Sequence, residues 1–229
     1  MINTLIFDLD RTLLNLKDSE RIAIRYMFEN FFTSSVTFET FFTVYQKHNE
    51  YWWDKKSKYE ASETEVKEYR FRDTLNELSV QTELTTKEIS ELYFKHAQHY
   101  WALYKDASSV LEYCSKHYQL GMITNGFTRT QNVKLDLLNI RHYFKFIGLS
   151  EEIGYSKPDP KIYEYTLNQL GVNAEHAVYI GDDYTSDILG SKNAGLTPIW
   201  FNEERKANPE GFLEFSEFKD FYSILEKLN

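Results

Sequence analysis

Two aspartates with the spacing of a catalytic pair stand near the start of this chain of 229 residues. Asp8 ends a short apolar run, residues 3–8, and Asp10 follows it closely. This run predicts a buried strand. Residues i and i+2 share one face of a strand, so both carboxylates could reach one substrate if the chain turns just after Asp8. One acid could then attack as a nucleophile while the other moves protons. The pair alone, however, arises by chance too often to decide a function.

Further polar residues follow predicted strands in the second half of the chain. The carboxyl ends of parallel strands meet at one edge of a sheet, so we expect these side chains to converge there with Asp8 and Asp10. Carboxylates that crowd one crevice repel one another, and a hard cation with oxygen ligands, such as Mg²⁺, relieves that repulsion. Hydroxyl, backbone N–H and ammonium donors would bind a phosphate, so the set predicts phosphoryl chemistry. The residues are Thr124-Asn125-Gly126, Lys157 before Pro158, and Gly181-Asp182-Asp183 with Asp187.

An alternation of short strands and helices after residue 106 predicts the elements that position these residues. Such alternation indicates βαβ units and an α/β fold with a parallel sheet, which the strand at 3–8 would join. The expected strands are 119–124, 144–149, 177–181 and 198–201, and the expected helices are 108–116, 128–138, 161–170, 186–193 and 215–228.

Residues 15–103 have a different character. Apolar and aromatic side chains recur there at helical spacing and predict about four helices with an aromatic interior. Thr37 and Thr85 are candidate N-caps. All nine glycines lie at or after Gly121 and all four prolines at or after Pro158, as expected when long helices precede tight strand–helix turns. We therefore expect a discontinuous core, residues 1–14 and 105–229, and an inserted all-α domain, residues 15–104.

Composition excludes several classes of protein. The net charge of −9 argues against a nucleic acid polymer as partner, although one local cation can still attract a small phosphate. No apolar run reaches the roughly 18 residues of a membrane span. The single cysteine, Cys114, predicts a small core residue on a helix and fits a reducing compartment. We expect a cytoplasmic protein that acts on a small molecule, and the sequence does not predict its oligomeric state.

The ordered motifs resemble those of the haloacid dehalogenase superfamily of aspartate-nucleophile phosphohydrolases. The resemblance implies a Rossmann-like core with helices on both faces of its sheet and a helical C1-type cap. It also implies that Mg²⁺ is the cofactor and a phosphomonoester the substrate. The implied roles are nucleophile and metal ligand for Asp8, acid/base and backbone metal ligand for Asp10, phosphate binding for Thr124, Asn125 and Lys157, and metal binding for Asp182 and Asp187. The roles of Arg11 and Asp183 stay open.

A finer resemblance lies in the cap. Tyr45-Gln46-x-x-Asn49-x-x-x-Trp53, followed by Tyr69-Arg70-Phe71, is similar to a run in bacterial 5′-nucleotidases acting on pyrimidine nucleoside monophosphates. An aromatic wall can stack a base, while Asn and Arg side chains can hydrogen-bond it. Asn49, Trp53 and Arg70 are thus candidate substrate contacts. Their helical spacing is equally compatible with packing inside the cap.

Several functions compete with that of a Mg²⁺-dependent nucleotidase. Another small-metabolite phosphatase and a β-phosphoglucomutase-like phosphomutase would use the same motifs. A 2-haloacid dehalogenase shares the fold but needs no Mg²⁺ and normally lacks the second acid, Asp10. A non-catalytic binding protein is disfavoured because buried carboxylates are costly without a function.

Overall fold

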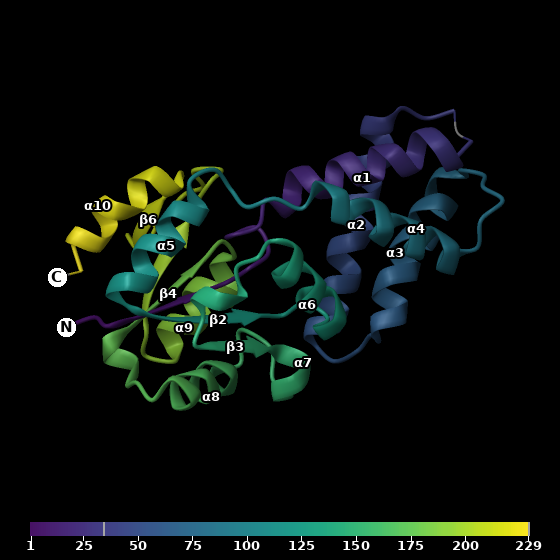
Figure 1. The fold of residues 1–229 in the computed structure, drawn as a ribbon. Coiled ribbons are helices and arrows are strands. Elements are labelled where there is room, and N and C mark those ends of the chain that lie inside the picture. Colours follow the sequence, from purple (N-terminus) through teal and green to yellow (C-terminus); the bar gives the residue numbers. More distant parts are fainter. Residues whose placement is uncertain (34, 229) are drawn as a thin grey trace. The chain divides into compact units, whose positions relative to one another are not determined.

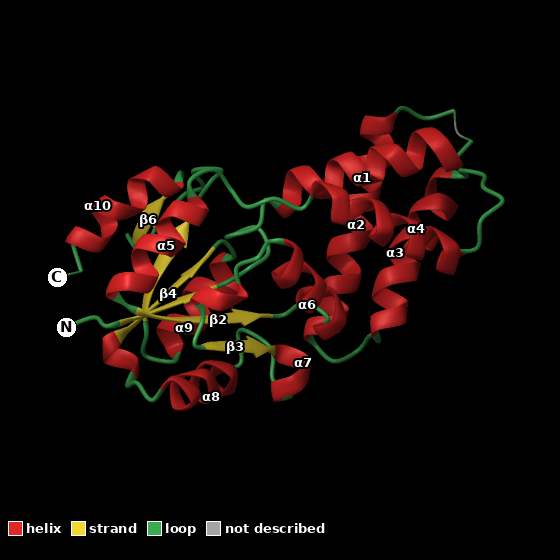
Figure 2. Ribbon diagram, in the orientation of Figure 1, coloured by secondary structure: helices red, strands yellow, loops and turns green. Residues whose placement is uncertain are grey.

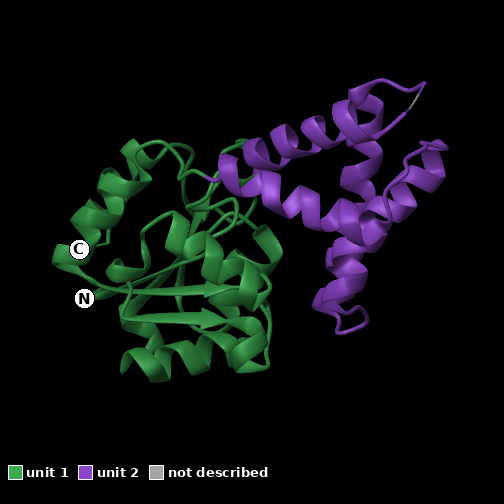
Figure 3. Ribbon diagram, turned by 45° about the vertical axis from the view of Figure 1, so that its right-hand side comes forward, with its two compact units in different colours: residues 1–16, 102–229 green, residues 17–101 purple. Residues whose placement is uncertain are grey.

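The computed structural model describes residues 1–33 and 35–228. The chain forms two compact units, which Figure 3 shows in two colours. The first unit joins residues 1–16 to residues 102–229, and the second comprises residues 17–101.

A six-stranded sheet, all of it parallel, forms the centre of the first unit (Figure 2). The strand order is β3-β2-β1-β4-β5-β6, so β1 lies between β2 and β4. The chain builds outward from β1 in both directions, and in such sheets the ligand crevice lies where the order reverses. Five of the strands were predicted from sequence. The strands are β1 (Thr4–Phe7), β2 (Gln119–Thr124), β3 (Phe146–Leu149), β4 (Ala177–Gly181), β5 (Thr197–Phe201) and β6 (Leu213–Phe215).

Helices cover both faces of this sheet (Figure 1). Ile6 packs in one cluster with Ile162 and Leu167 of α8, whereas the ring of its neighbour Phe7 contacts Phe221 of α10. Alternate strand residues thus bury themselves under different helices, which confirms the predicted α/β core. The helices of this unit are α5 (Ala107–His117), α6 (Thr128–Leu137), α7 (Ser150–Ile153), α8 (Pro160–Leu170), α9 (Gly190–Asn193) and α10 (Phe221–Glu226). Cys114 lies buried in α5, as expected.

The predicted helix over 215–228 is wrong at its start. Phe215 ends the sixth strand and pairs with Phe201 of β5, and α10 begins only at Phe221 after a short 3₁₀ turn. Phe215, Phe218 and Phe221 are all buried, so apolar residues recur at helical spacing through the strand and the turn as well. The expected helix at 186–193 also differs, because a π-helical segment, Tyr184–Leu189, precedes α9.

Four α-helices form the described part of the second unit, as the sequence predicted. They are α1 (Leu16–Phe31, beginning at the last residue of the first unit), α2 (Phe38–Ser57), α3 (Glu63–Leu78) and α4 (Thr86–Ala97). Thr37 and Thr85 cap α2 and α4 as expected, and Ser62 adds a capping box at α3. Buried phenylalanines and tyrosines, such as Phe41 and Tyr45, fill the interior between the helices. Over the described residues, none of the helices has the length and apolar character needed to cross a membrane.

Candidate active site

The predicted motif residues lie at the carboxyl ends of adjacent strands in the first unit. Asp8 follows β1, Thr124 ends β2, and Asp182 follows β4. Because β1 pairs with both β2 and β4, these three positions are neighbours across the sheet. The backbone N–H of Asp8 donates to the carbonyl of Ile180 at 2.9 Å, which continues the β1–β4 pairing by one residue.

Lys157 joins two of the predicted acids. Its Nζ donates to Oδ1 of Asp8 and to Oδ1 of Asp187, both at 2.7 Å, and to the hydroxyl of Tyr179 at 2.9 Å. All of these contacts are buried. Tyr179 was expected only as a strand residue, and its place within an apolar strand gave no sign of this contact. The motifs from three distant parts of the chain thus meet in one buried cluster.

Asp182 completes a group of three carboxylates with Asp8 and Asp187. One oxygen from each lies within 4.8 Å of the others. Oδ2 of Asp8 is buried and has no hydrogen-bond partner among the described residues, and Oδ1 of Asp182 accepts only a long bond of 3.2 Å from Thr12. An all-oxygen set with an unpartnered buried carboxylate oxygen fits a hard divalent cation such as Mg²⁺.

Electrostatics around these carboxylates point the same way. Burial raises the pKa of Asp8 to about 7 even though Lys157 opposes it, and Asp187 adds to the rise. Burial and the charges of Asp187 and Asp8 likewise raise the pKa of Asp182 well above its usual value. Burial lowers the pKa of Lys157, but the two carboxylates outweigh it and the net shift is upward. One ammonium cannot balance three acids, so the cluster has a place for further positive charge.

The carboxylate of Asp10 lies against helix α6. Its Oδ1 accepts from Nζ of Lys134 at 2.5 Å, and its Oδ2 accepts from Nε2 of Gln131 at 2.7 Å. The same Gln131 nitrogen donates to the hydroxyl of Thr124 at 2.9 Å. The sequence analysis missed Gln131 and Lys134. They stand three residues apart, on one face of a helix, and two polar side chains on a buried helical face are the signal that could have drawn attention to them.

The side chains of Asn125 and Asp183 form hydrogen bonds with backbone groups. The Asn125 amide accepts from the Lys157 N–H and donates to the Lys157 carbonyl, both at 2.9 Å, and so joins the loop after β2 to the loop that carries the lysine. Asp183 is exposed and caps the helical segment after β4 through the N–H groups of Thr185 and Ser186. The extra acid after Gly181 is therefore a helix cap, which answers the question its sequence position left open.

Two glycines leave room for site side chains. A Cβ on Gly126 would lie 1.6 Å from Nε2 of Gln131, and a Cβ on Gly181 would lie 2.4 Å from the carboxylate of Asp187. Sequence analysis assigned glycines in this core to tight strand–helix turns. At these two positions the absence of a side chain lets Gln131 and Asp187 reach the site.

Comparison with known proteins identifies the family. Residues 5–201 match the family described as haloacid dehalogenase-like hydrolase, which covers most of the chain. The chain belongs to the haloacid dehalogenase-like hydrolases. The predicted family, fold and hydrolase class are confirmed by this match.

The chain is also similar to individual members of the family. It is 41% identical to the pyrimidine 5′-nucleotidase YjjG of Escherichia coli over 106 residues, 46% of this chain and 47% of YjjG. The matched segment thus spans about half the length of that relative. It is 25% identical to the pyrimidine 5′-nucleotidase PynA of Streptococcus pneumoniae over 97% of this chain and 94% of PynA. The crystal structure of the HAD-hydrolase YfnB of Bacillus subtilis bound to magnesium has a TM-score of 0.85 and 28% identity, covering 98% of this chain and 99% of that one.

In this hydrolase, two of the candidate substrate contacts in the second unit meet inside that unit. Nη1 of Arg70 donates to Oδ1 of Asn49 at 2.8 Å and lies 4.0 Å from the carboxylate of Glu20, which also accepts from the hydroxyl of Tyr45 at 3.1 Å. Glu20, Asn49 and Arg70 are all buried. Trp53 is half-buried one turn further along α2, with its ring centroid 5.9 Å from Nζ of Lys56.

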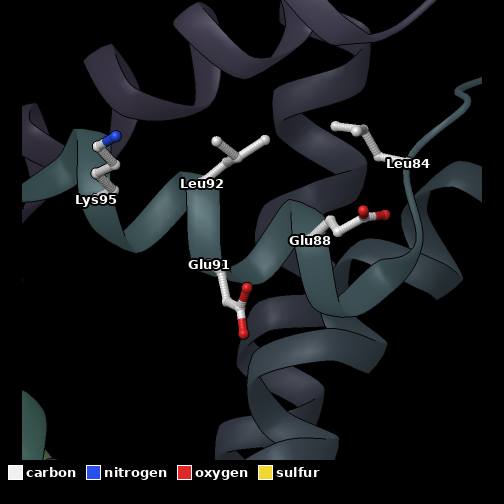
Figure 4. A pocket seen from close by; sticks show the side chains of 5 residues that line it. All are labelled: Leu84, Glu88, Glu91, Leu92 and Lys95. Atoms are coloured by element: carbon white, nitrogen blue, oxygen red, sulfur yellow. The ribbon is translucent and has the colours of Figure 1, made fainter.

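A surface pocket of about 370 Å³ lies elsewhere in the second unit. Figure 4 shows its lining along α4 and the loop before it: Leu84, Glu88, Glu91, Leu92 and Lys95. None of the predicted site residues is among these five. Glu88 also takes part in the capping box of α4.

Proposed function

We propose that this hydrolase is a Mg²⁺-dependent phosphomonoesterase that works through an aspartyl-phosphate, with nucleoside 5′-monophosphates of pyrimidines as substrates. The observation that carries the proposal is the buried contact of Lys157 with Asp8 and Asp187 beside Asp182. It supports the proposal because it brings together a carboxylate that could act as nucleophile, an ammonium group that could bind phosphate and carboxylates that could bind a metal ion.

The side chains divide the reaction between them. A carboxylate oxygen of Asp8 forms a bond to phosphorus while the bond from phosphorus to the leaving oxygen breaks, and Asp10 gives that oxygen its proton. Water then attacks the phosphorus of the aspartyl-phosphate, Asp10 accepts the proton of that water, and the bond to Asp8 breaks. Lys157 and Thr124 offset the charge on the phosphate oxygens throughout.

Asp8, Asp182, Asp187 and the backbone carbonyl of Asp10 would hold the Mg²⁺. When bound, the ion neutralises charge on the phosphate and on the carboxylates. Asp8 can then stay ionised for attack although burial and the charge of Asp187, against the opposing effect of Lys157, raise its pKa to about 7. The crystal structure of the similar YfnB, described as bound to magnesium, supports this choice of ion.

The preference for pyrimidine nucleotides rests on the second unit. Similarity to YjjG and PynA supports it, as does the run that contains Asn49, Trp53 and Arg70. Under this proposal the unit of residues 17–101 serves as the cap domain of the family and supplies contacts to the substrate. Trp53 would stack the base, and Asn49 with Arg70 would contact the base or the sugar.

Release of phosphate from p-nitrophenyl phosphate, with Mg²⁺ and with EDTA, tests the reaction. We expect turnover that EDTA abolishes and that added Mg²⁺ restores. Metal-independent turnover would contradict the role of Mg²⁺, and the absence of turnover would favour a dehalogenase or a binding protein. Either result would refute the proposal.

A panel of nucleoside monophosphates and sugar phosphates tests the substrate. We expect the highest kcat/KM for pyrimidine nucleotides. Equal or higher values for sugar phosphates would indicate a different small-metabolite phosphatase. Net interconversion of sugar phosphates without release of phosphate would indicate a phosphomutase.

A further inference from the structure

Helix α6 carries two buried polar side chains that the proposed reaction does not yet use. Gln131 is fully buried and Lys134 is 5% exposed, although Gln and Lys side chains are mostly found at the surface. Burying an ammonium group is costly unless an opposite charge and hydrogen bonds compensate it. The carboxylate of Asp10 supplies that compensation at 2.5 Å.

Each oxygen of the Asp10 carboxylate has its own donor from this helix. Lys134 holds Oδ1 and Gln131 holds Oδ2, so the carboxylate cannot rotate about its last bond without breaking a contact. The side chain of Asp10 is 24% exposed, and its backbone lies beyond the end of β1. The two donors therefore hold a carboxylate that is only partly buried.

Gln131 also relates Asp10 to the phosphate-binding motif. One nitrogen, Nε2, donates both to Asp10 and to the hydroxyl of Thr124. Thr124 ends β2 and Asp10 follows β1, so this amide sets the position of one catalytic segment relative to the other. Gly126 is required for the arrangement, because a Cβ there would meet Gln131 at 1.6 Å.

We propose that Gln131 and Lys134 are positioning residues. They hold the carboxyl group of Asp10 in place, relative to Thr124, so that this group can transfer a proton to the leaving oxygen. The proposal rests on the proposed function, in which Asp10 is the acid/base. It adds that α6, an element outside the motifs, determines how well that acid works. Misplacement of a catalytic group by about 1 Å can cost on the order of 10²-fold in rate.

The test compares two substrates that differ only in the leaving group. Phenyl phosphate releases a phenol that needs a proton, whereas 2,4-dinitrophenyl phosphate releases a phenolate that does not. The parameter kcat/KM reports the step in which the leaving oxygen departs. For Lys134→Met and Gln131→Met we expect kcat/KM to fall about 100-fold with phenyl phosphate and only a few-fold with the dinitrophenyl ester. Lys134→Arg, which keeps a donor and a charge, should recover part of the loss.

A double-mutant cycle separates positioning from a general structural role. In an Asp10→Asn background, Lys134→Met should cause little further loss, because a residue that acts through Asp10 has nothing left to position. Arg129→Met, which removes an exposed cation from the same helix, should match the wild type on both substrates. Gly126→Ala should reproduce the leaving-group pattern of Gln131→Met by displacing that side chain.

Equal losses on both esters, or additive losses in the cycle, would overturn the proposal. A raised inhibition constant for inorganic phosphate, with no leaving-group dependence, would show instead that Lys134 binds the phosphate directly. If Lys134→Met fails to fold, the same comparison with Gln131→Met and Lys134→Arg decides. A wild-type protein without activity on either ester would refute the proposed function rather than this role of α6.

Discussion

Each unit of this protein buries a cluster of charged side chains, and the two clusters are balanced differently. In the helical unit, one carboxylate, Glu20, faces one guanidinium, Arg70, with the neutral side chains of Tyr45 and Asn49 completing the hydrogen bonds. At the strand ends of the other unit, Lys157 forms ion pairs with both Asp8 and Asp187, and Asp182 lies beside them. One cluster is neutral as it stands, and the other has an excess of negative charge.

This difference separates a cluster whose charges balance one another from a cluster that needs further positive charge. A neutral buried pair satisfies its own members, and removing one of them leaves the other unpaired. An unbalanced group of acids raises its own pKa values, as seen for Asp8 and Asp182, and it becomes stable only with a proton or a cation. The four predictions below test this contrast, from the largest expected effect to the smallest.

Asp8→Asn should abolish turnover, by on the order of 10⁴-fold or more, because the amide cannot attack phosphorus. Thermal unfolding in EDTA should show no loss of stability, since the substitution removes one of several like charges. The measurements are phosphate release and calorimetry. Retained activity would remove Asp8 as the nucleophile.

Glu20→Gln should lower the free energy of unfolding by about 3 kcal/mol, because it leaves the Arg70 guanidinium buried without its counter-charge. Glu39→Gln is the matched control. Glu39 pairs with Arg21 at an exposed site, so its loss should change the free energy of unfolding much less than the loss of Glu20. Denaturant titration of both variants measures the difference, and similar losses would contradict the contrast between buried and exposed pairs.

Mg²⁺ should stabilise the wild-type protein against unfolding, by about 2.7 kcal/mol when its concentration is 100 times the Kd. Asp182→Asn should reduce that gain, whereas Glu20→Gln should retain it, because only the cluster of Asp8, Asp182 and Asp187 takes up a cation. Thermal unfolding with Mg²⁺ and with EDTA provides the test. An equal gain in Asp182→Asn would place the ion elsewhere.

Asp183→Ala should cost about 1 kcal/mol of stability, the usual effect of losing an N-cap. Asp183→Ser should restore most of it, because a serine hydroxyl can cap the same N–H groups. Both variants should keep activity within a few-fold of the wild type. A large loss of activity in Asp183→Ser would show that this acid takes part in the site after all.

Sequence alone determined the elements and the kind of chemistry. The strands at β1, β2 and β4 were predicted from short apolar runs, and the polar residues at their carboxyl ends were predicted to meet because parallel strands end at a common edge. These inferences succeed because both depend on local order along the chain. The predicted start of the helix at 215–228 was wrong because buried aromatic residues continue at helical spacing through β6 and the turn after it.

Only the tertiary structure decided how the polar side chains pair. Gln131 and Lys134 meet Asp10 across 121 and 124 residues of sequence, and no local pattern predicts a contact at that range. Arg70 and Asn49 likewise meet only in the folded chain, where they form a hydrogen bond. Their helical spacing was compatible with packing and with substrate binding alike. Residue type and spacing indicate which chemical groups are available. Which side chains form hydrogen bonds or ion pairs with one another depends on how distant segments of the chain pack in the fold.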